Sequence, residues 1–179
     1  MRFLRNLFAF SFIVLLVVSC KKEVNLDEPP EILYGEDSCD ECAMIINEPR
    51  YAASYVTEGG DVRRFDDIGG MLLHDHKMQE DVFVYWVHDR NSEEWIKAKD
   101  SILVLDADLI TPMGWGLAAF AQIADAEDYV SEHGGTLGTF AEIQKLVQSG
   151  ELDPSSVSTH NHETEMDGEM GEMDHQDDS

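Results

Sequence analysis

Three sulfur-bearing side chains lie close together in one short segment of the chain. Cys39 and Cys42 are three positions apart, and Met44 follows two positions later. Two thiolates and a thioether are soft donors, and soft donors favour Cu(I) over Ca²⁺, Mg²⁺ or Mn²⁺. Taken alone, Met44 is more typical of a methionine that packs in a core than of a metal ligand. The spacing of the three residues therefore predicts a site for one soft metal ion.

A fourth candidate donor, Met113, lies between Pro112 and Gly114 in a predicted loop. A loop methionine beside these residues is either presented outward as a ligand or packed within the loop. The cysteine pair also has two other interpretations, a thiol–disulfide oxidoreductase and a structural zinc site. Zinc prefers four ligands, and the sequence has no second CxxC or Cys/His pair of suitable spacing. A redox CxxC normally opens a helix in a βαβ unit, which this context lacks.

The N-terminus has the pattern of an export signal. Arg2 and Arg5 precede an apolar run over residues 7–18, and the run ends at Ser19 and Cys20. This run is shorter than the roughly 20 apolar residues of a membrane-spanning helix. Its ending resembles a bacterial lipobox, which makes residues 1–20 a lipoprotein signal peptide and Cys20 a lipid anchor. We therefore expect a lipoprotein of the cell envelope that faces the periplasm from either membrane.

The charge balance limits the partners and the organisation of the chain. The 179 residues include 12 basic and 37 acidic side chains, which gives a net charge of −25 and argues against nucleic acid as a partner. After the signal, residues 21–30 are predicted to be a tether and residues 31–150 a metal-binding domain. Residues 151–179 are acidic, lack Lys and Arg, and have too few aliphatic side chains for a core, so we expect a disordered tail.

The predicted tail also contains histidine and methionine, which can capture metal ions weakly. The alternative interpretation is a solvated acidic tail in which these residues have no role. The candidate donors are His160, His162, Met166, Met170, Met173 and His175.

The spacing of apolar and turn residues predicts strands before each helix. Residues 50–65 are expected to form a hairpin that turns at Gly59 and Gly60, and Asp66 or Asp67 is expected to cap the next helix. Residues 81–88, 95–96 and 101–105 have strand-forming composition and begin a second such round.

The C-terminal part of the predicted domain is expected to be mostly helical. The loop over residues 111–116 is predicted to enter a helix that bears Leu117 and Phe120 and ends at Gly134. A last helix is predicted from the capping-box pattern at Thr139 to Gly150. The expected fold class is therefore α+β, with two ββα-type units of antiparallel strands, a C-terminal helix and the disordered tail.

Several motifs together resemble the NosL family, although each is weak alone. In chain order they are Cys39-x-x-Cys42-x-Met44, Tyr51-Ala52-Ala53, Phe65-Asp66-Asp67-Ile68-Gly69, Thr111-Pro112-Met113-Gly114-Trp115-Gly116-x-x-Ala119-Phe120, and Gly134-Gly135. Their order and spacing match the family over nearly the whole predicted domain. One position departs from the family, which usually reads CxxCGM where this chain has Ala43.

The resemblance implies a copper chaperone rather than an enzyme. NosL proteins are lipoproteins that supply Cu(I) for the assembly of nitrous oxide reductase, so this enzyme or its assembly proteins are the implied partners. The implied fold is a pair of ββα units like those of the organomercurial lyase. The resemblance assigns Asp66 and Asp67 to a family motif, and we interpret them as helix caps or as residues that orient the ligands. The implied copper ligands are Cys39, Cys42, Met44 and Met113.

Overall fold

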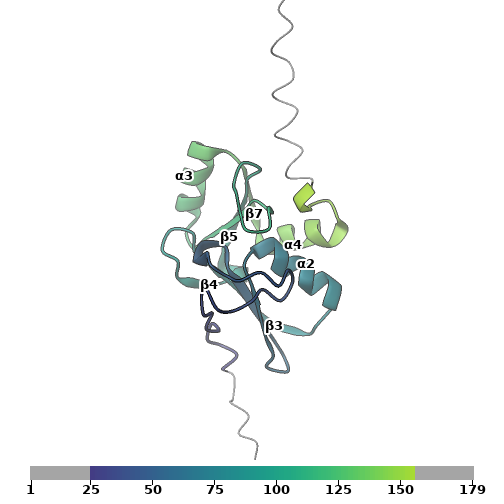
Figure 1. Ribbon diagram of the computed structural model, residues 1–179. Coiled ribbons are helices and arrows are strands. Elements are labelled where there is room, and N and C mark those ends of the chain that lie inside the picture. Colours follow the sequence, from purple (N-terminus) through teal and green to yellow (C-terminus); the bar gives the residue numbers. More distant parts are fainter. Residues whose placement is uncertain (1–24, 156–179) are drawn as a thin grey trace, which may run out of the picture.

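The computed structural model describes residues 25–155, and these contain two antiparallel sheets (Figure 1). The larger sheet has four strands in the order β2-β1-β3-β4. The predicted hairpin is confirmed, because β1 and β2 pair antiparallel and Gly60 takes a left-handed turn conformation (φ 85°) between them. The strands of this sheet are β1 (Ala53–Thr57), β2 (Val62–Phe65), β3 (Val82–His88) and β4 (Trp95–Lys97).

The smaller sheet has three strands in the order β6-β5-β7. A parallel bridge between Asp89 and Ala119 connects it to the end of β3, where the Arg90 amide also donates to the Ala119 carbonyl at 2.8 Å. The strands of this sheet are β5 (Ile102–Leu105), β6 (Leu117–Phe120) and β7 (Thr136–Thr139).

Helix boundaries follow the capping residues of the sequence. Asp67 caps α2 by accepting from the Gly69 amide, and Thr139 forms the predicted capping box of α4 with Glu142. Gly134 follows the last residue of α3, as predicted, and Gly150 (φ 75°) follows α4. The helices are α2 (Ile68–Met78), α3 (Ile123–His133) and α4 (Phe140–Ser149), with short 3₁₀ helices η1 (Pro49–Tyr51) and η2 (Ala98–Asp100).

Two units of the same topology account for most of the described residues. The first is β1-β2-α2-β3 and the second is β5-β6-α3-β7, and in each unit the first strand lies at the centre. The α+β class with antiparallel pairing is therefore confirmed, and each ββα unit is extended by a returning strand. Residues 82–88 form β3 and complete the first unit, although their position in the sequence predicted the start of the second.

One helix boundary was predicted wrongly. Leu117 and Phe120 lie in strand β6, and α3 begins only at Ile123. Every residue of β6 is buried, so the strand is a short continuous apolar run. Such a run has neither the alternation of a half-buried strand nor a period that distinguishes it from a helix. Strand β7 was not predicted, since it is short, contains Gly138 and is mostly exposed.

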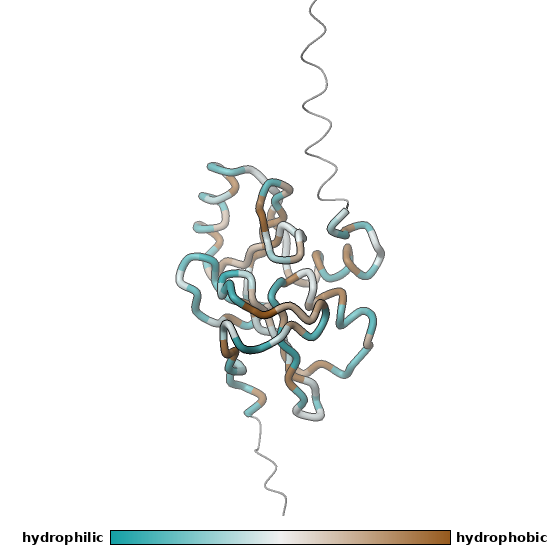
Figure 2. Tube along the Cα trace, viewed as in Figure 1, coloured by the Kyte–Doolittle hydropathy of each residue, from teal (hydrophilic) through white to brown (hydrophobic). Residues whose placement is uncertain are grey.

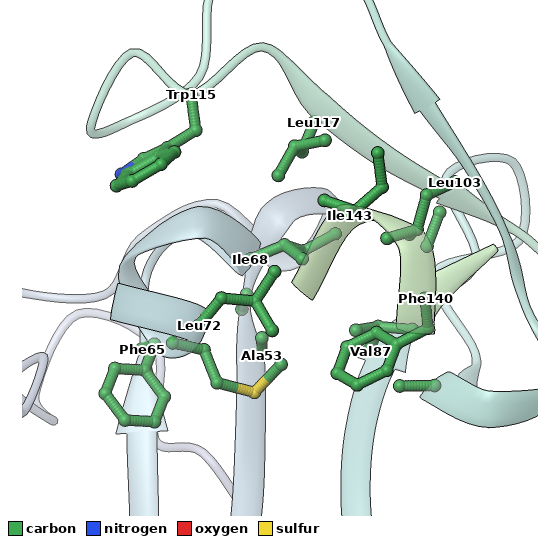
Figure 3. Packing of buried hydrophobic residues seen from close by; sticks show 14 of the residues in the cluster. Ala53, Phe65, Ile68, Leu72, Val87, Leu103, Trp115, Leu117, Phe140 and Ile143 are labelled. Carbon is green, nitrogen blue, oxygen red and sulfur yellow. The ribbon is translucent and has the colours of Figure 1, made fainter. Parts of the chain in front are cut away.

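The main core lies between the four-stranded sheet and helices α2 and α4. Figure 3 shows Ile68 and Leu72 of α2 between Phe65 on one side and Phe140 and Ile143 on the other. All five side chains are buried. Figure 2 shows hydrophilic residues along much of α3, whose described side chains are largely exposed. Among residues 25–155, no helix is both long and apolar enough to cross a membrane.

Close packing at the start of α2 requires two glycines. A Cβ atom on Gly69 would lie 2.1 Å from the Trp115 ring, and one on Gly70 would lie 2.5 Å from Met113 Sδ. A larger residue at Gly69 would therefore force the Trp115 ring to move, and one at Gly70 would push the Met113 thioether away from the helix. The absence of side chains at Gly69 and Gly70 therefore allows Met113 and Trp115 to pack against the first turn of α2.

Candidate metal centre

The two cysteines lie in a tight loop that precedes the first sheet. The Cys39 amide donates to the Met44 carbonyl at 2.8 Å, and the Ala43 amide donates to the Cys39 carbonyl at 2.9 Å. The turn closes at Ala43, whose φ of 61° lies in the left-handed region. A side chain with a Cβ adopts this region at a cost of about 1 kcal/mol, so the turn is strained at this residue.

The loop is fastened to the edge of the four-stranded sheet. The Asp40 amide donates to the Arg64 carbonyl at 2.8 Å, and the Arg64 amide donates to Asp40 Oδ2 at 2.6 Å. Arg64 is in β2, whose other side pairs with β1. These bonds satisfy part of the open strand edge and place the cysteines beside the link from β2 to α2.

Three potential metal donors converge at this position. One atom each from Cys39, Cys42 and Asp66 lies within 4.8 Å of the other two. The Cys42 thiol donates to the Asp66 carboxylate, with Sγ 3.5 and 3.6 Å from the two oxygens. The Cys42 amide donates to Cys39 Sγ at 3.5 Å. Both sulfur atoms therefore lie beside a buried carboxylate, an arrangement that can hold a cation.

Burial strongly affects the chemistry of Cys39. Its side chain is 2% exposed, and burial raises the pKa of the Cys39 thiol to about 12. Without metal, this thiol is neutral at physiological pH, because water cannot stabilise a thiolate there. A metal ion that bound Cys39 would therefore have to displace this proton, and the metal–sulfur bond would offset the cost of ionisation.

The neighbouring carboxylate, Asp67, organises the Met113 loop. Asp67 Oδ2 accepts from the Thr111 hydroxyl at 2.6 Å and from the Met113 amide at 3.0 Å, while Oδ1 accepts from the Gly69 amide at 2.9 Å. Burial raises the pKa of Asp67, and these hydrogen bonds oppose the shift. The predicted capping role is confirmed for Asp67. Asp66 instead contacts the Cys42 thiol.

The two methionines occupy different environments. The thioether of Met113 lies against Gly70 at the first turn of α2, on the element that Asp66 and Asp67 precede. Met44 is 47% exposed on the cysteine loop. Their assignment as copper ligands stays a prediction. The lipid-anchor residue Cys20 and the tail donors, His160, His162, Met166, Met170, Met173 and His175, lie outside the described residues, and their roles also stay predictions.

Two residues of this site, Asp40 and Glu41, were given no role from the sequence. Asp66 was interpreted as a helix cap or as a residue that orients the ligands, and its contact with the Cys42 thiol agrees with the second interpretation. Asp40 binds β2, and Glu41 contacts His74 and Lys77 of α2. The acidic Cys-Asp-Glu-Cys sequence is the one signal that could have indicated these anchors. Their partners are too far away in the sequence to be inferred.

The sequence of residues 30–147 matches the family model described as NosL. This chain belongs to the NosL family. The fold is similar to the crystal structure of the copper chaperone NosL from Shewanella denitrificans, with a TM-score of 0.58 and 23% sequence identity. That comparison covers 64% of this chain and 94% of the other. A search of curated proteins gave no match. The resemblance implies a glycine where this chain has Ala43, and glycine would adopt a φ of 61° without strain.

Proposed function

We propose that this protein is a Cu(I) chaperone that binds one copper ion at the Cys39–Cys42 loop. The convergence of two cysteine sulfurs and the Asp66 carboxylate within 4.8 Å carries the proposal. Membership of the NosL family and the fold shared with a protein named as a copper chaperone support it. Thiolates favour Cu(I), which is a soft cation and is stable with few ligands.

The proposed ligands suit a carrier better than a permanent metal site. Cys42 is partly exposed, whereas Cys39 is buried. An acceptor's ligand can therefore approach the copper from the side of Cys42 before Cys39 releases it. Met113 and Met44 are proposed as additional thioether donors, and such neutral donors hold Cu(I) without adding negative charge.

The proposed acceptor is nitrous oxide reductase or one of its assembly proteins, outside the cytoplasm. The signal-like N-terminus and Cys20 support a lipid anchor, and the NosL family supports the acceptor. Substitution of Cys20 by serine is expected to release the protein from the membrane fraction, since the diacylated cysteine supplies the attachment. Continued membrane association of this variant would contradict the proposed anchor.

The environment of the thiols argues against an oxidoreductase. A reactive thiol of that class has a lowered pKa and commonly lies at a helix N-terminus. Here the Cys39 pKa is raised to about 12, and both cysteines lie in a loop that no described helix includes. A structural zinc site needs four ligands, and the cluster of Cys, His, Asp and Glu donors in residues 25–155 has three.

The metal preference of the reduced protein tests the proposed function. Under anaerobic conditions, titration against a chromophoric Cu(I) chelator is expected to give about one tightly bound Cu(I) per chain, because the donors are sulfur. A parallel Zn(II) titration is expected to show much weaker binding. Equal affinities for Zn(II) and Cu(I) would refute the copper assignment and favour a structural zinc site.

A further inference from the structure

Glu41 lies between the two cysteines, and its side chain reaches helix α2. Glu41 Oε2 is 3.1 Å from His74 Nδ1, and Oε1 contacts the Lys77 ammonium. A carboxylate only accepts, so the His74 ring nitrogen donates this hydrogen bond. The side chains of Glu41 and His74 are each 11% exposed, whereas that of Lys77 is 52% exposed. The contact with His74 is therefore the more shielded of the two.

His74 is a fixed point rather than a mobile surface residue. Its ring packs against Phe65, with centroids 5.2 Å apart, and against Tyr55 at 6.2 Å. Both aromatic side chains are fully buried. Because the His74 ring is held by this packing, its hydrogen bond to Glu41 also restrains the Glu41 side chain.

Glu41 and Asp40 attach the cysteine loop to two different elements. Asp40 binds β2 through Arg64, and Glu41 binds α2 through His74. Asp66 lies on the short link between the same two elements, since β2 ends at Phe65 and α2 begins at Ile68. Attachment on both sides of this link fixes the loop relative to Asp66.

We propose that Glu41 is a positioning residue of the metal centre. Through its hydrogen bond to His74, it holds Cys42 beside Asp66 before copper arrives. Without this anchor, the turn would keep its bonds to β2 and the Cys42–Asp66 contact but would lose its attachment to α2. Copper binding would then have to restrict the motion of Cys42. The loss of chain entropy would then oppose binding. This inference rests on the proposed Cu(I) function, which it deepens by assigning a residue that binds no metal itself.

A double-mutant cycle with full-length reduced protein tests the pair. The variants are Glu41→Ala, His74→Phe and the combination, and phenylalanine keeps a ring between Phe65 and Tyr55. Each single variant is expected to bind Cu(I) about tenfold more weakly, as for other residues that orient ligands indirectly. The double variant is expected to lose no more Cu(I) affinity than either single variant, because both changes break the same contact. Asp100→Ala, in an exposed pair with Lys99, is the matched control.

X-ray absorption at the copper edge supplies a readout that altered stability alone would not change. Fewer sulfur ligands are expected for Glu41→Ala than for the unsubstituted protein. Glu41→Gln keeps an acceptor for His74 Nδ1–H. This variant is expected to retain both the Cu(I) affinity and the number of sulfur ligands. If Glu41→Ala does not fold, weak binding by His74→Phe together with normal binding by Glu41→Gln supports the proposal.

Two results would overturn the positioning role. One is normal Cu(I) affinity and sulfur coordination in Glu41→Ala or in His74→Phe. The other is an affinity loss in the combination that equals the product of the single losses, which would mean that the residues act independently. Failure of the unsubstituted protein to bind Cu(I) would instead refute the proposed function, so the two failures are distinguishable.

Discussion

The Cys42 thiol donates a hydrogen bond to the Asp66 carboxylate, across a separation of 24 residues in the sequence. The two residues meet because the cysteine loop docks on β2, directly before the link that contains Asp66. Asp66 is 2% exposed, and its contact with Cys42 fixes the direction of the thiol. The site therefore combines a sulfur-rich loop with a carboxylate from the start of a helix.

Replacement of Asp66 by asparagine is expected to weaken Cu(I) binding about tenfold. The amide keeps the shape of the side chain but removes the negative charge beside the bound cation. Competition titration with a chromophoric chelator measures the effect. Asp128→Asn, on the exposed surface of α3, removes the same charge far along the chain from the site and is the matched control. An unchanged affinity in Asp66→Asn would show that the carboxylate has no part in copper binding.

A comparison of the two units shows that the link from the second strand to the helix is acidic in the first unit and uncharged in the second. The first unit joins strand and helix through Phe65-Asp66-Asp67-Ile68, and the second does so through Phe120-Ala121-Gln122-Ile123. The two links have the same length, and each begins with phenylalanine and ends with isoleucine. The equivalence becomes visible only once β6 is known to be a strand.

Local signals in the sequence predicted much of the fold. The glycine turn before β2 and the capping box at Thr139 depend on neighbouring residues, so they were predicted correctly. The short buried strand β6 depends on tertiary burial and was misread as helix. At the site, the CxxC spacing is local, whereas the contacts of Asp66 with Cys42 and of Glu41 with His74 join distant segments. Such contacts follow from docking of the loop, which no local pattern indicates.

Replacement of Ala43 by glycine is expected to stabilise the metal-free protein by about 0.5 to 1 kcal/mol. Its φ of 61° is a strained conformation for alanine and an ordinary one for glycine. Urea denaturation of the reduced protein measures the change. Ala141→Gly, in the exposed first turn of α4, is the matched control and should destabilise the protein, because glycine there gains no conformational relief. Destabilisation by Ala43→Gly would be evidence against strain in the turn.

The stability of the metal-free protein is expected to fall as the pH rises above about 9. Burial raises the pKa of Cys39 from 9.0 to about 12, so the unfolded chain releases this proton at a lower pH than the folded chain. The unfolded state then binds fewer protons, and stability declines with rising pH, by at most about 1.4 kcal/mol per pH unit.

The contribution of Cys39 is isolated by comparison with Cys39→Ala. Both proteins lose stability in alkali through other groups, so the informative quantity is the difference between their urea midpoints from pH 8 to 10.5. This difference is expected to change with pH, since alanine does not ionise. A constant difference would mean that Cys39 ionises equally well in the folded and unfolded states.

The Met113 thioether is expected to contribute to tight copper binding, whereas the C-terminal tail is not. The Met113 amide binds Asp67, and its sulfur is seated against Gly70, so the fold holds this donor in place before metal arrives. A tail that wraps an ion must instead lose chain entropy, at roughly 1–2 kcal/mol per ordered residue. Neutral histidine donors are also lost below about pH 6.5, whereas metal-bound thiolates resist protonation better.

Three variants separate the two sources of binding. Met113→Ala and Cys42→Ser are expected to weaken Cu(I) binding, and deletion of residues 156–179 is expected to leave the tight site intact. The deletion begins after Ser155 because Leu152 is buried in the core and its amide binds the Leu146 carbonyl. Measured under the same anaerobic conditions, a larger loss of affinity from the deletion than from Cys42→Ser would place the tight copper site in the tail. A loss confined to the two point variants would place it at the junction of the cysteine loop and α2.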